Sequence, residues 1–118
     1  MRRNHKDLRA WQSAMQLVEM TYRLTSTFPR EEIYGLSSQM RRAAVSVPSN
    51  IAEGAARQST KDLLRFLVIA SGSLAELDTQ LELSLNIGYC QDTSLVQLKI
   101  DEVSALTHAL MKSLRERE

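Results

Sequence analysis

Apolar side chains recur in steps of three and four residues through four successive stretches of the sequence. This spacing places them on one face of an α-helix. The connections between the stretches are short, so neighbouring helices are expected to lie antiparallel. No stretch has the strict alternation of a β-strand. We therefore predict an all-α, antiparallel up-down-up-down four-helix bundle. It forms a single domain over residues 1–118, a length that fits one domain.

The first helix is expected from about Asp7 to Thr27, with the Asp7 carboxylate as its N-cap. Its end is predicted at Phe28-Pro29, because the residue before a proline avoids the α conformation. The stripe predicted to face the core consists of Leu8, Trp11, Met15, Val18, Tyr22 and Thr25.

The second helix is expected to begin near Arg30–Glu32, where acidic side chains favour the positive end of the helix dipole. Pro48 lies inside its pattern and removes one backbone hydrogen bond. We expect a kink near Pro48, because the apolar phase continues beyond it; a break into two helices at Val47 is the alternative. The predicted core stripe is Ile33, Leu36, Met40, Ala44, Val47 and Ile51.

Ser59 is the predicted N-cap of the third helix, with Asp62 completing a pair that resembles a capping box. Gly88 is expected to end this helix in the left-handed conformation. The predicted stripe of the third helix is Leu63, Phe66, Leu67, Ala70, Leu74, Leu77, Leu81 and Leu85. That of the fourth is Val96, Ile100, Val103, Leu106, Leu110 and Leu114.

Motifs typical of enzymes and metal sites are missing from the sequence. His5 and His108 have no acid or cysteine at metal-ligand spacing. No glycine-rich phosphate loop or nucleophile elbow occurs. Cys90 is the one cysteine, which excludes an internal disulfide, and it has no basic partner nearby in sequence. We therefore expect a protein without enzymatic activity, cofactor, metal or small-molecule substrate.

The sequence also bears on location. No stretch has the run of about 18 apolar residues that a membrane span needs. The N-terminus has basic residues but lacks the apolar run of a secretory signal. A single free cysteine is typical of a reducing compartment. We therefore expect a cytoplasmic protein that does not enter membranes.

The stretch from Ala43 to Ala56 has small or apolar side chains nearly all round, with Glu53 as its one charge. Such a helix should be covered on more than one side. The third helix also has apolar residues off its core stripe. We predict self-association through these two helices; the alternative is a central bundle helix with scattered surface apolar residues. The predicted interface residues are Val45, Ser46, Ser49, Asn50, Glu53, Val68 and Gly72.

The formal net charge of +1 hides a lopsided distribution. Residues 1–65 have a balance of +5 and residues 66–118 one of −4. Clustered cations make phosphate contacts that give affinity without reading sequence. The predicted nucleic-acid-binding residues are Arg41, Arg42, Arg57, Lys61 and Arg65, with Arg2, Arg3 and Lys6 as a basic arm. Two alternatives remain: solvated faces with salt bridges, or pairing of the arginines with Glu53 between subunits.

The sequence resembles a known family along almost its whole length. The most specific stretch runs from Gln39 to Gly54, QMRRAAVSVPSNIAEG, and is accompanied by Trp11-Gln12, Phe28-Pro29 and Tyr34-Gly35-Leu36. These motifs are similar to those of the four-helix-bundle family of intervening-sequence proteins. The founding members of that family are encoded inside insertions in bacterial large-subunit ribosomal RNA genes.

The resemblance implies a homo-oligomer in the form of a pentameric ring. It also implies a fold relationship to the accessory variability determinant of diversity-generating retroelements, a basic pentamer that works with a reverse transcriptase and nucleic acid. The near-zero net charge departs from that relative. We predict an accessory protein that binds RNA or a nucleoprotein through a basic face. The alternatives are a protein-only scaffold and, more remotely, an enzyme with a site between subunits.

Overall fold

Four α-helices make up most of residues 4–117, which are the residues described by the structure, a computed structural model. They are α1 (Arg9–Thr25), α2 (Leu36–Ala55), α3 (Thr60–Asn86) and α4 (Ser94–Glu116). Two short 3-10 helices, η1 (His5–Asp7) and η2 (Arg30–Tyr34), precede α1 and α2. No strand occurs within the described range. The predicted all-α class and the four helices are therefore confirmed.

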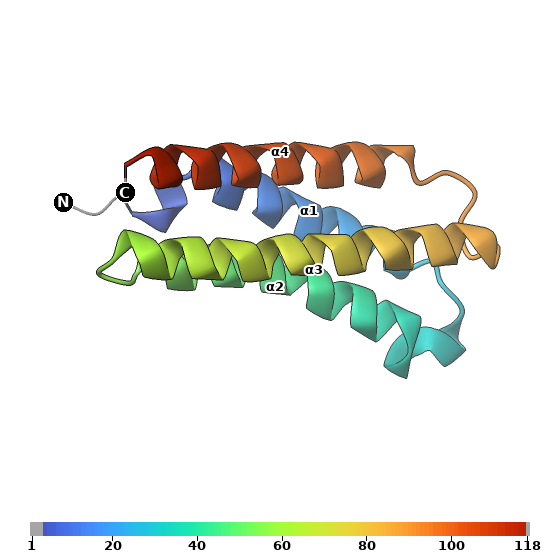
Figure 1. Cartoon of the computed structure of the whole chain (residues 1–118). Helices are drawn as coiled ribbons and strands as arrows, with labels where there is room; N and C mark the ends of the chain where they lie inside the picture. Colours follow the sequence, from blue (N-terminus) through green and yellow to red (C-terminus); the bar gives the residue numbers. More distant parts are fainter. Residues whose placement is uncertain (1–3, 118) are drawn as a thin grey trace.

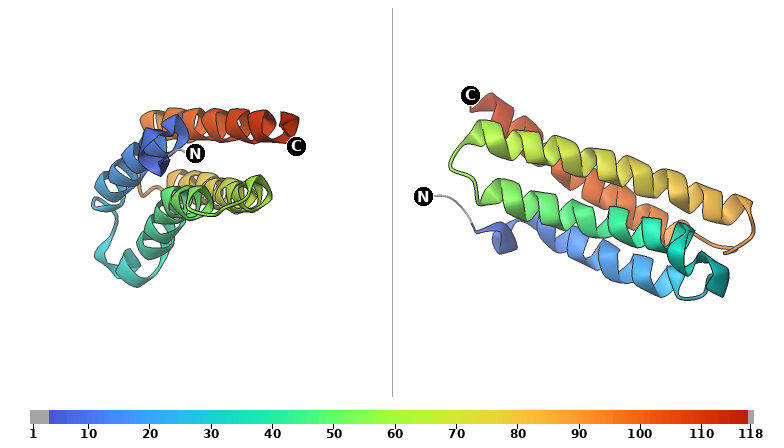
Figure 2. Two further views of the ribbon diagram at one scale, coloured as in Figure 1. Left: turned by 90° about the vertical axis from the view of Figure 1, so that its left-hand side faces the viewer. Right: turned by 90° about the horizontal axis from the view of Figure 1, so that it is seen from below.

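The helices form an elongated molecule of 46 × 23 × 19 Å. Each packs against the next in sequence, and α4 closes the arrangement against α1. Figure 1 shows consecutive helices running in opposite directions along the long axis, with the connection from α2 to α3 at the same end as the start of α1 and the end of α4. The right panel of Figure 2 shows α2 between α1 and α3. This topology gathers distant parts of the chain at each end of the bundle.

The buried face of α1 is rotated from the predicted stripe. Met15 and Tyr22 are 40% and 44% exposed, so their assignment to the core was wrong. Small side chains and threonines take their place because they let the neighbouring helices approach closely. Thr21 and Thr25 donate their hydroxyl hydrogens to main-chain carbonyls one turn earlier, each at 2.8 Å, which satisfies their donors in the core. The buried residues of α1 are Ala10, Ser13, Ala14, Leu17, Thr21 and Thr25.

Two predicted helix starts were wrong. Leu8 occupies the N-cap position of α1 without a side-chain hydrogen bond, and Asp7 belongs to η1. The segment predicted to open α2 forms η2 instead, and Gly35, with φ −116° and ψ −119°, separates the two helices. Ile33 is consequently 53% exposed rather than part of the core. Helix propensity and the acidic side chains predicted that residues 30–34 are helical. They form a 3-10 helix, however, and the α-helix begins only after Gly35.

The helix α2 continues through Pro48 to Ala55, so the alternative of two helices broken at Val47 was wrong. The kink stays a prediction. The other helix boundaries agree with the sequence: Ser59 Oγ accepts from the Asp62 amide at 3.1 Å, and Gly88 has φ 83° just after α3. Most of the predicted stripe residues of α3 and α4 are buried.

Glycine is required where the end of α2 packs on the start of α3. A Cβ atom added at Gly54 would lie 2.7 Å from Phe66 Cβ and 3.0 Å from Leu63 Cδ1. Real Cβ atoms do not approach other carbons this closely, so a larger residue would push the two helices apart. Gly72, in the middle of α3, has no heavy atom within 4 Å of such a Cβ. The two glycines therefore form a matched pair for measuring this contact.

A hydrogen-bonded glutamate joins the two loops at the far end of the bundle. Glu32 Oε1 accepts from the Leu36 amide at 2.8 Å, at the start of α2. Glu32 Oε2 accepts from the Tyr89 hydroxyl at 2.6 Å. The Tyr89 bond, followed by the Leu36 bond, lowers the pKa of Glu32 below its ordinary value of 4.5. The same contact raises the pKa of Tyr89 above 10.0.

These shifts predict a pH dependence of stability. A carboxyl group with a lowered pKa in the folded state stabilises the fold above its unfolded pKa, and that contribution is lost as the pH falls through the folded value. We expect Glu32→Gln to lower the urea midpoint at about pH 7 and the difference from the unmodified protein to narrow well below pH 4.5. Glu31→Gln, one residue away and exposed, is the control. Equal midpoints for the two variants at neutral pH would contradict the prediction.

Candidate nucleic-acid interface

Exposed cations gather at the end of the bundle where α2 passes into α3. This end also contains the start of α1 and the end of α4 (Figure 1). With each helix divided at its middle, the described residues place eight lysines and arginines and four acids here, all eight cations being exposed. We call this region the basic end. Its cations are Lys6, Arg9, Arg57, Lys61, Arg65, Lys112, Arg115 and Arg117.

The opposite end has the reverse balance. It contains five lysines and arginines and nine acids among residues 4–117. The two ends of the molecule therefore differ in charge, but this division is not the one between the two halves of the sequence, because Arg23, Arg30, Arg41 and Arg42 of the basic half lie at the acidic end. Because the bundle is 46 Å long, and the Debye length is about 8 Å at physiological ionic strength, the two ends are screened from each other.

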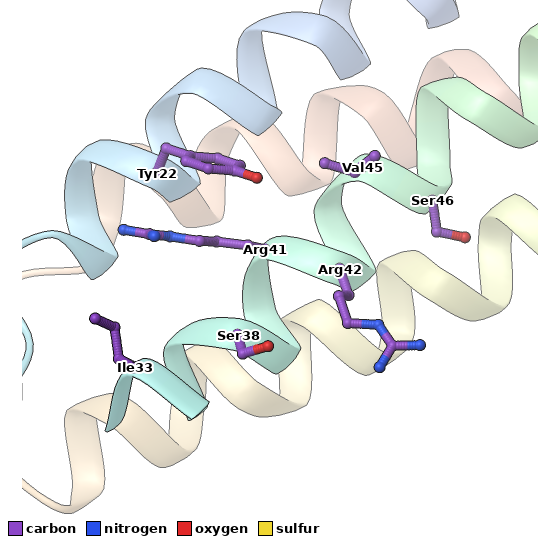
Figure 3. Close-up of a pocket in the computed structure, with 7 residues that line it drawn as sticks. All are labelled: Tyr22, Ile33, Ser38, Arg41, Arg42, Val45 and Ser46. Carbon is purple, nitrogen blue, oxygen red and sulfur yellow. The ribbon is translucent and has the colours of Figure 1, made fainter. Parts of the chain in front are cut away.

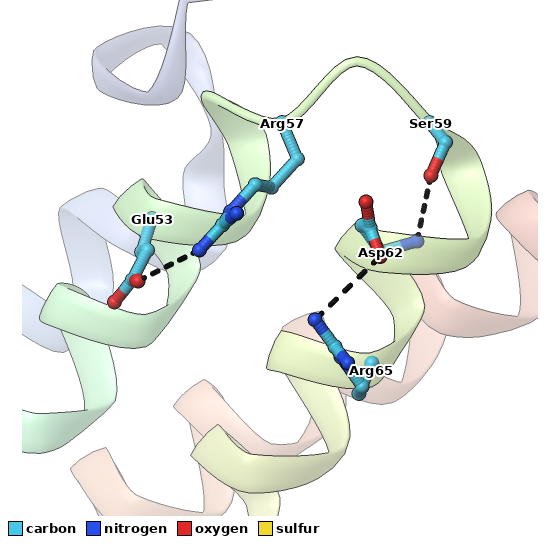
Figure 4. A network of polar contacts seen from close by, with 5 residues as sticks. All are labelled: Glu53, Arg57, Ser59, Asp62 and Arg65. Atoms are coloured by element: carbon cyan, nitrogen blue, oxygen red, sulfur yellow. Dashed lines mark hydrogen bonds and ion pairs between the residues drawn. The ribbon is translucent and has the colours of Figure 1, made fainter.

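Two arginines of the basic end are held by a shared aromatic ring. The guanidinium carbons of Arg57 and Arg65 lie 5.0 Å and 5.5 Å from the centre of the Phe66 ring. Each also pairs with an acid on a helix: Arg57, in the turn after α2, pairs with Glu53 of α2 at 3.1 Å, and Arg65 pairs with Asp62 of its own helix at 3.6 Å (Figure 4). Exposed pairs of this kind contribute little to stability. The guanidinium groups are therefore oriented but remain able to exchange a carboxylate for a phosphate.

Lys61, Arg115 and Arg117 have no ion pair among residues 4–117. Lys61 is in the set predicted from the sequence, whereas the cations near the end of α4 are not, because they belong to the acidic half of the chain. The predicted topology contained the signal: in an up-down-up-down bundle the end of the fourth helix returns to the connection between the second and third. Arg2 and Arg3, from the predicted basic arm, lie outside the described residues.

Arg41 and Arg42 are not part of the basic end. Arg41 lies 14 residues before Ala55, the last residue of α2, which separates the two by about 21 Å along the helix axis at 1.5 Å per residue, and Arg57 follows in the turn. The predicted nucleic-acid-binding set is therefore divided. Arg57, Lys61 and Arg65 come together around one turn, whereas Arg41 and Arg42 lie near α1 and η2.

The predicted interface residues lie on or near the surface of the single chain. Glu53 has a 56% exposed side chain and pairs with Arg57 of its own chain. Ser46 is hydrogen-bonded to Ser73 at 2.8 Å, which joins α2 to α3, and Asn50 donates to the Ser46 carbonyl at 2.8 Å within α2. The exposed members of the set are Val45, Ser49, Glu53, Val68 and Gly72. Their role in self-association stays a prediction.

Within residues 4–117 no group of three or more His, Cys, Asp or Glu side chains could hold a metal ion. His108 is exposed, with its Nδ1 2.8 Å from the Ser104 carbonyl of the same helix. Cys90 Sγ lies 3.4 Å from Ser84 Oγ at the connection between α3 and α4. In the same part of the chain, every helix is too short or too polar to cross a membrane.

Most of the chain matches one known protein family. The model of the 23S rRNA-intervening sequence protein family matches residues 6–109. The chain belongs to that family. The resemblance noted in the sequence is thereby confirmed at the level of the family. No curated protein sequence matches the chain.

The match places the basic end partly outside the shared region of the intervening-sequence proteins. Lys6, Arg9, Arg57, Lys61 and Arg65 fall within residues 6–109. Lys112 and Arg115 follow the matched region on the same helix as its last residues, and Arg117 is the C-cap of that helix. This intervening-sequence protein therefore has cations beyond the region described by the family model.

Proposed function

We propose that this intervening-sequence protein is a cytoplasmic, non-enzymatic homo-oligomer that binds RNA or a nucleoprotein as an accessory factor. The observation that supports RNA binding is the basic end, which contains eight exposed lysines and arginines but only four acidic residues among the described residues. Lysines and arginines that neutralise phosphates release counterions, which gives affinity without sequence reading. The net charge of +1 does not oppose this proposal, because most of the acids are at the other end.

Self-association would strengthen such binding. The resemblance to the family implies a pentameric ring, in which the same basic end would be repeated. Contacts that are individually weak act together when one RNA can reach several of them. The exposed apolar residues Val68 and Ile69 and the open surface at Gly72 support an interface on α3.

The same apolar surface also favours a second candidate function, a protein-only scaffold without affinity for nucleic acid. The two candidates differ in their response to salt. RNA binding predicts retention of the protein on immobilised RNA at low salt and its release as salt is raised. A protein that is not retained even at low salt would favour the scaffold.

Self-association predicts a solution mass several times 13.4 kDa in light scattering at micromolar concentration. We expect Val68→Glu to reduce that mass to the monomer, because it places a charge on the predicted interface. Leu95→Glu is the matched control, since Leu95 is also exposed but lies at the start of α4, outside the predicted set. A monomeric unmodified protein, or equal masses for the two variants, would contradict the proposed interface.

A further inference from the structure

A second cationic region lies away from the basic end, in a surface hollow where α1, η2 and α2 meet. The hollow has a volume of about 500 Å³. It is widely open to solvent, so a molecule bound in it would stay partly exposed. Figure 3 shows side chains from all three elements around it. Its lining residues are Tyr22, Ile33, Ser38, Arg41, Arg42, Val45 and Ser46.

Arg41 is held in a defined orientation in this hollow. Its Nε donates to Thr25 Oγ1 at 2.8 Å, and its guanidinium carbon lies 4.7 Å from the centre of the Tyr22 ring. Thr25 is buried, and its one hydroxyl hydrogen is donated to the Thr21 carbonyl. Thr25 Oγ1 therefore has no hydrogen left to donate and is the acceptor of the hydrogen bond from Arg41. Figure 3 shows the Arg41 side chain extended alongside Tyr22.

The terminal amino groups of Arg41 are not used by the fold. Among residues 4–117, Arg41 and Arg42 form no ion pair, unlike Arg57 and Arg65 at the basic end. The hydrogen bond of Arg41 to Thr25 occupies Nε and leaves both Nη groups available to a ligand. An arginine with a fixed plane and free terminal donors is suited to forked hydrogen bonds with a phosphate or carboxylate.

The rest of the lining is apolar or weakly polar. Tyr22, Ile33 and Val45 are all more than a third exposed and border the same hollow. Ser38 and Ser46 add hydroxyl groups, and Arg42 adds a second cation at the rim shared with the groove towards Ser73. An anionic group and a flat apolar body could thus be bound side by side. A nucleotide combines these two features.

We propose that the hollow binds a single nucleotide unit, with its phosphate on Arg41 and its base against the apolar lining formed by Tyr22, Ile33 and Val45, while Arg42, which points away from Arg41 in Figure 3, lies at the rim. For an unpaired nucleotide of a bound RNA, this inference rests on the proposed RNA-binding function. A free nucleoside monophosphate has the same chemistry. The hollow would then bind a single nucleotide, and the basic end would contact the sugar-phosphate backbone of the RNA.

The test is equilibrium dialysis of the full chain with labelled adenosine monophosphate, repeated with a short single-stranded RNA. We expect the monophosphate to bind and Arg41→Gln to weaken its binding by about tenfold or more, because charge-assisted hydrogen bonds are lost. Arg41→Lys keeps the charge but not the fork, and Thr25→Val keeps the charge but frees the guanidinium; both should weaken binding by a smaller factor. Lys61→Gln is the control and should leave monophosphate binding unchanged while weakening RNA binding.

The possible results separate this inference from the proposed function. RNA binding without monophosphate binding would contradict a nucleotide site in the hollow, and so would monophosphate binding that Arg41→Gln does not change. Neither result would contradict RNA binding by the basic end. Monophosphate binding that depends on Arg41 in a protein with no affinity for RNA would support the hollow as a site for free nucleotides and overturn the proposed function. If the monophosphate does not bind and Arg41→Gln lowers the oligomer mass, Arg41 is a subunit contact and the inference is wrong.

Discussion

The Gly54→Ala variant should have a free energy of unfolding about 1–3 kcal/mol lower than that of the Gly72→Ala variant, which is the usual cost of overpacking. The new methyl group at Gly54 would lie 2.7 Å from Phe66 Cβ, so α2 and α3 must separate. At Gly72 the methyl group meets no heavy atom within 4 Å. Both residues are inside helices, so the gain in helix propensity from alanine cancels in the comparison.

Urea unfolding at several protein concentrations measures this difference and separates it from any effect of Gly72 on assembly. Gly72→Ala alone should match or exceed the stability of the unmodified protein, since glycine costs roughly 0.5–1 kcal/mol in a helix relative to alanine. Equal stability of the two variants would show that the end of α2 can move away from Phe66 without cost. Because Phe66 also lies beside Arg57 and Arg65, Gly54→Ala should displace both guanidinium groups as well.

The double variant Lys61→Gln/Arg115→Gln should bind single-stranded RNA roughly tenfold or more weakly at low salt, since charge-assisted contacts are lost. Neither residue forms an ion pair within the described part of the chain, so the fold should be unaffected. Two lost phosphate contacts should also lower the slope of log affinity against log salt by about 1.4. Filter binding or fluorescence anisotropy over a range of salt concentrations measures both quantities.

The matched control changes the net charge by the same amount at the other end of the molecule. Asn86→Asp/Gln91→Glu is nearly isosteric and alters two exposed residues near the connection between α3 and α4. Both double variants take the formal net charge from +1 to −1. If RNA binding depends on the basic end, only Lys61→Gln/Arg115→Gln should bind RNA much more weakly than the unmodified protein. Equal losses would mean that RNA responds to the net charge of the protein and not to its distribution.

The helices were predictable from the sequence because the apolar spacing extends over many turns. The face of α1 was not, since the stripe was chosen from large side chains. Ala14 and Thr21 are buried instead, and a threonine can be buried when its hydroxyl bonds to its own helix. The start of α2 was misplaced because Glu31 and Glu32 favour a helix start, and nothing local distinguishes a 3-10 turn that ends at Gly35.

The candidate site was predictable only in part. The sequence places Arg57, Lys61 and Arg65 close together, and they are also close together in the folded chain. The link between Arg41 and Thr25 joins two helices, and the sequence contains no signal for it apart from the antiparallel pairing of those helices. The cations near the end of α4 were missed because the acids of α3 and of the first half of α4 outnumber them in the second half of the sequence. Charge counted along the chain is a poor guide when a bundle brings the ends together.

The separation of charge along the bundle makes the folded chain an electric dipole. Such a molecule rotates in the field of a polyanion, so that its positive pole arrives first. In a closed ring with subunits standing parallel, the dipoles add, and like poles of neighbouring subunits lie side by side. Added salt would relieve that lateral repulsion while it weakens attraction to phosphate. Low salt would therefore strengthen binding of RNA and weaken assembly of such a ring. High salt would weaken binding of RNA and favour assembly of the ring.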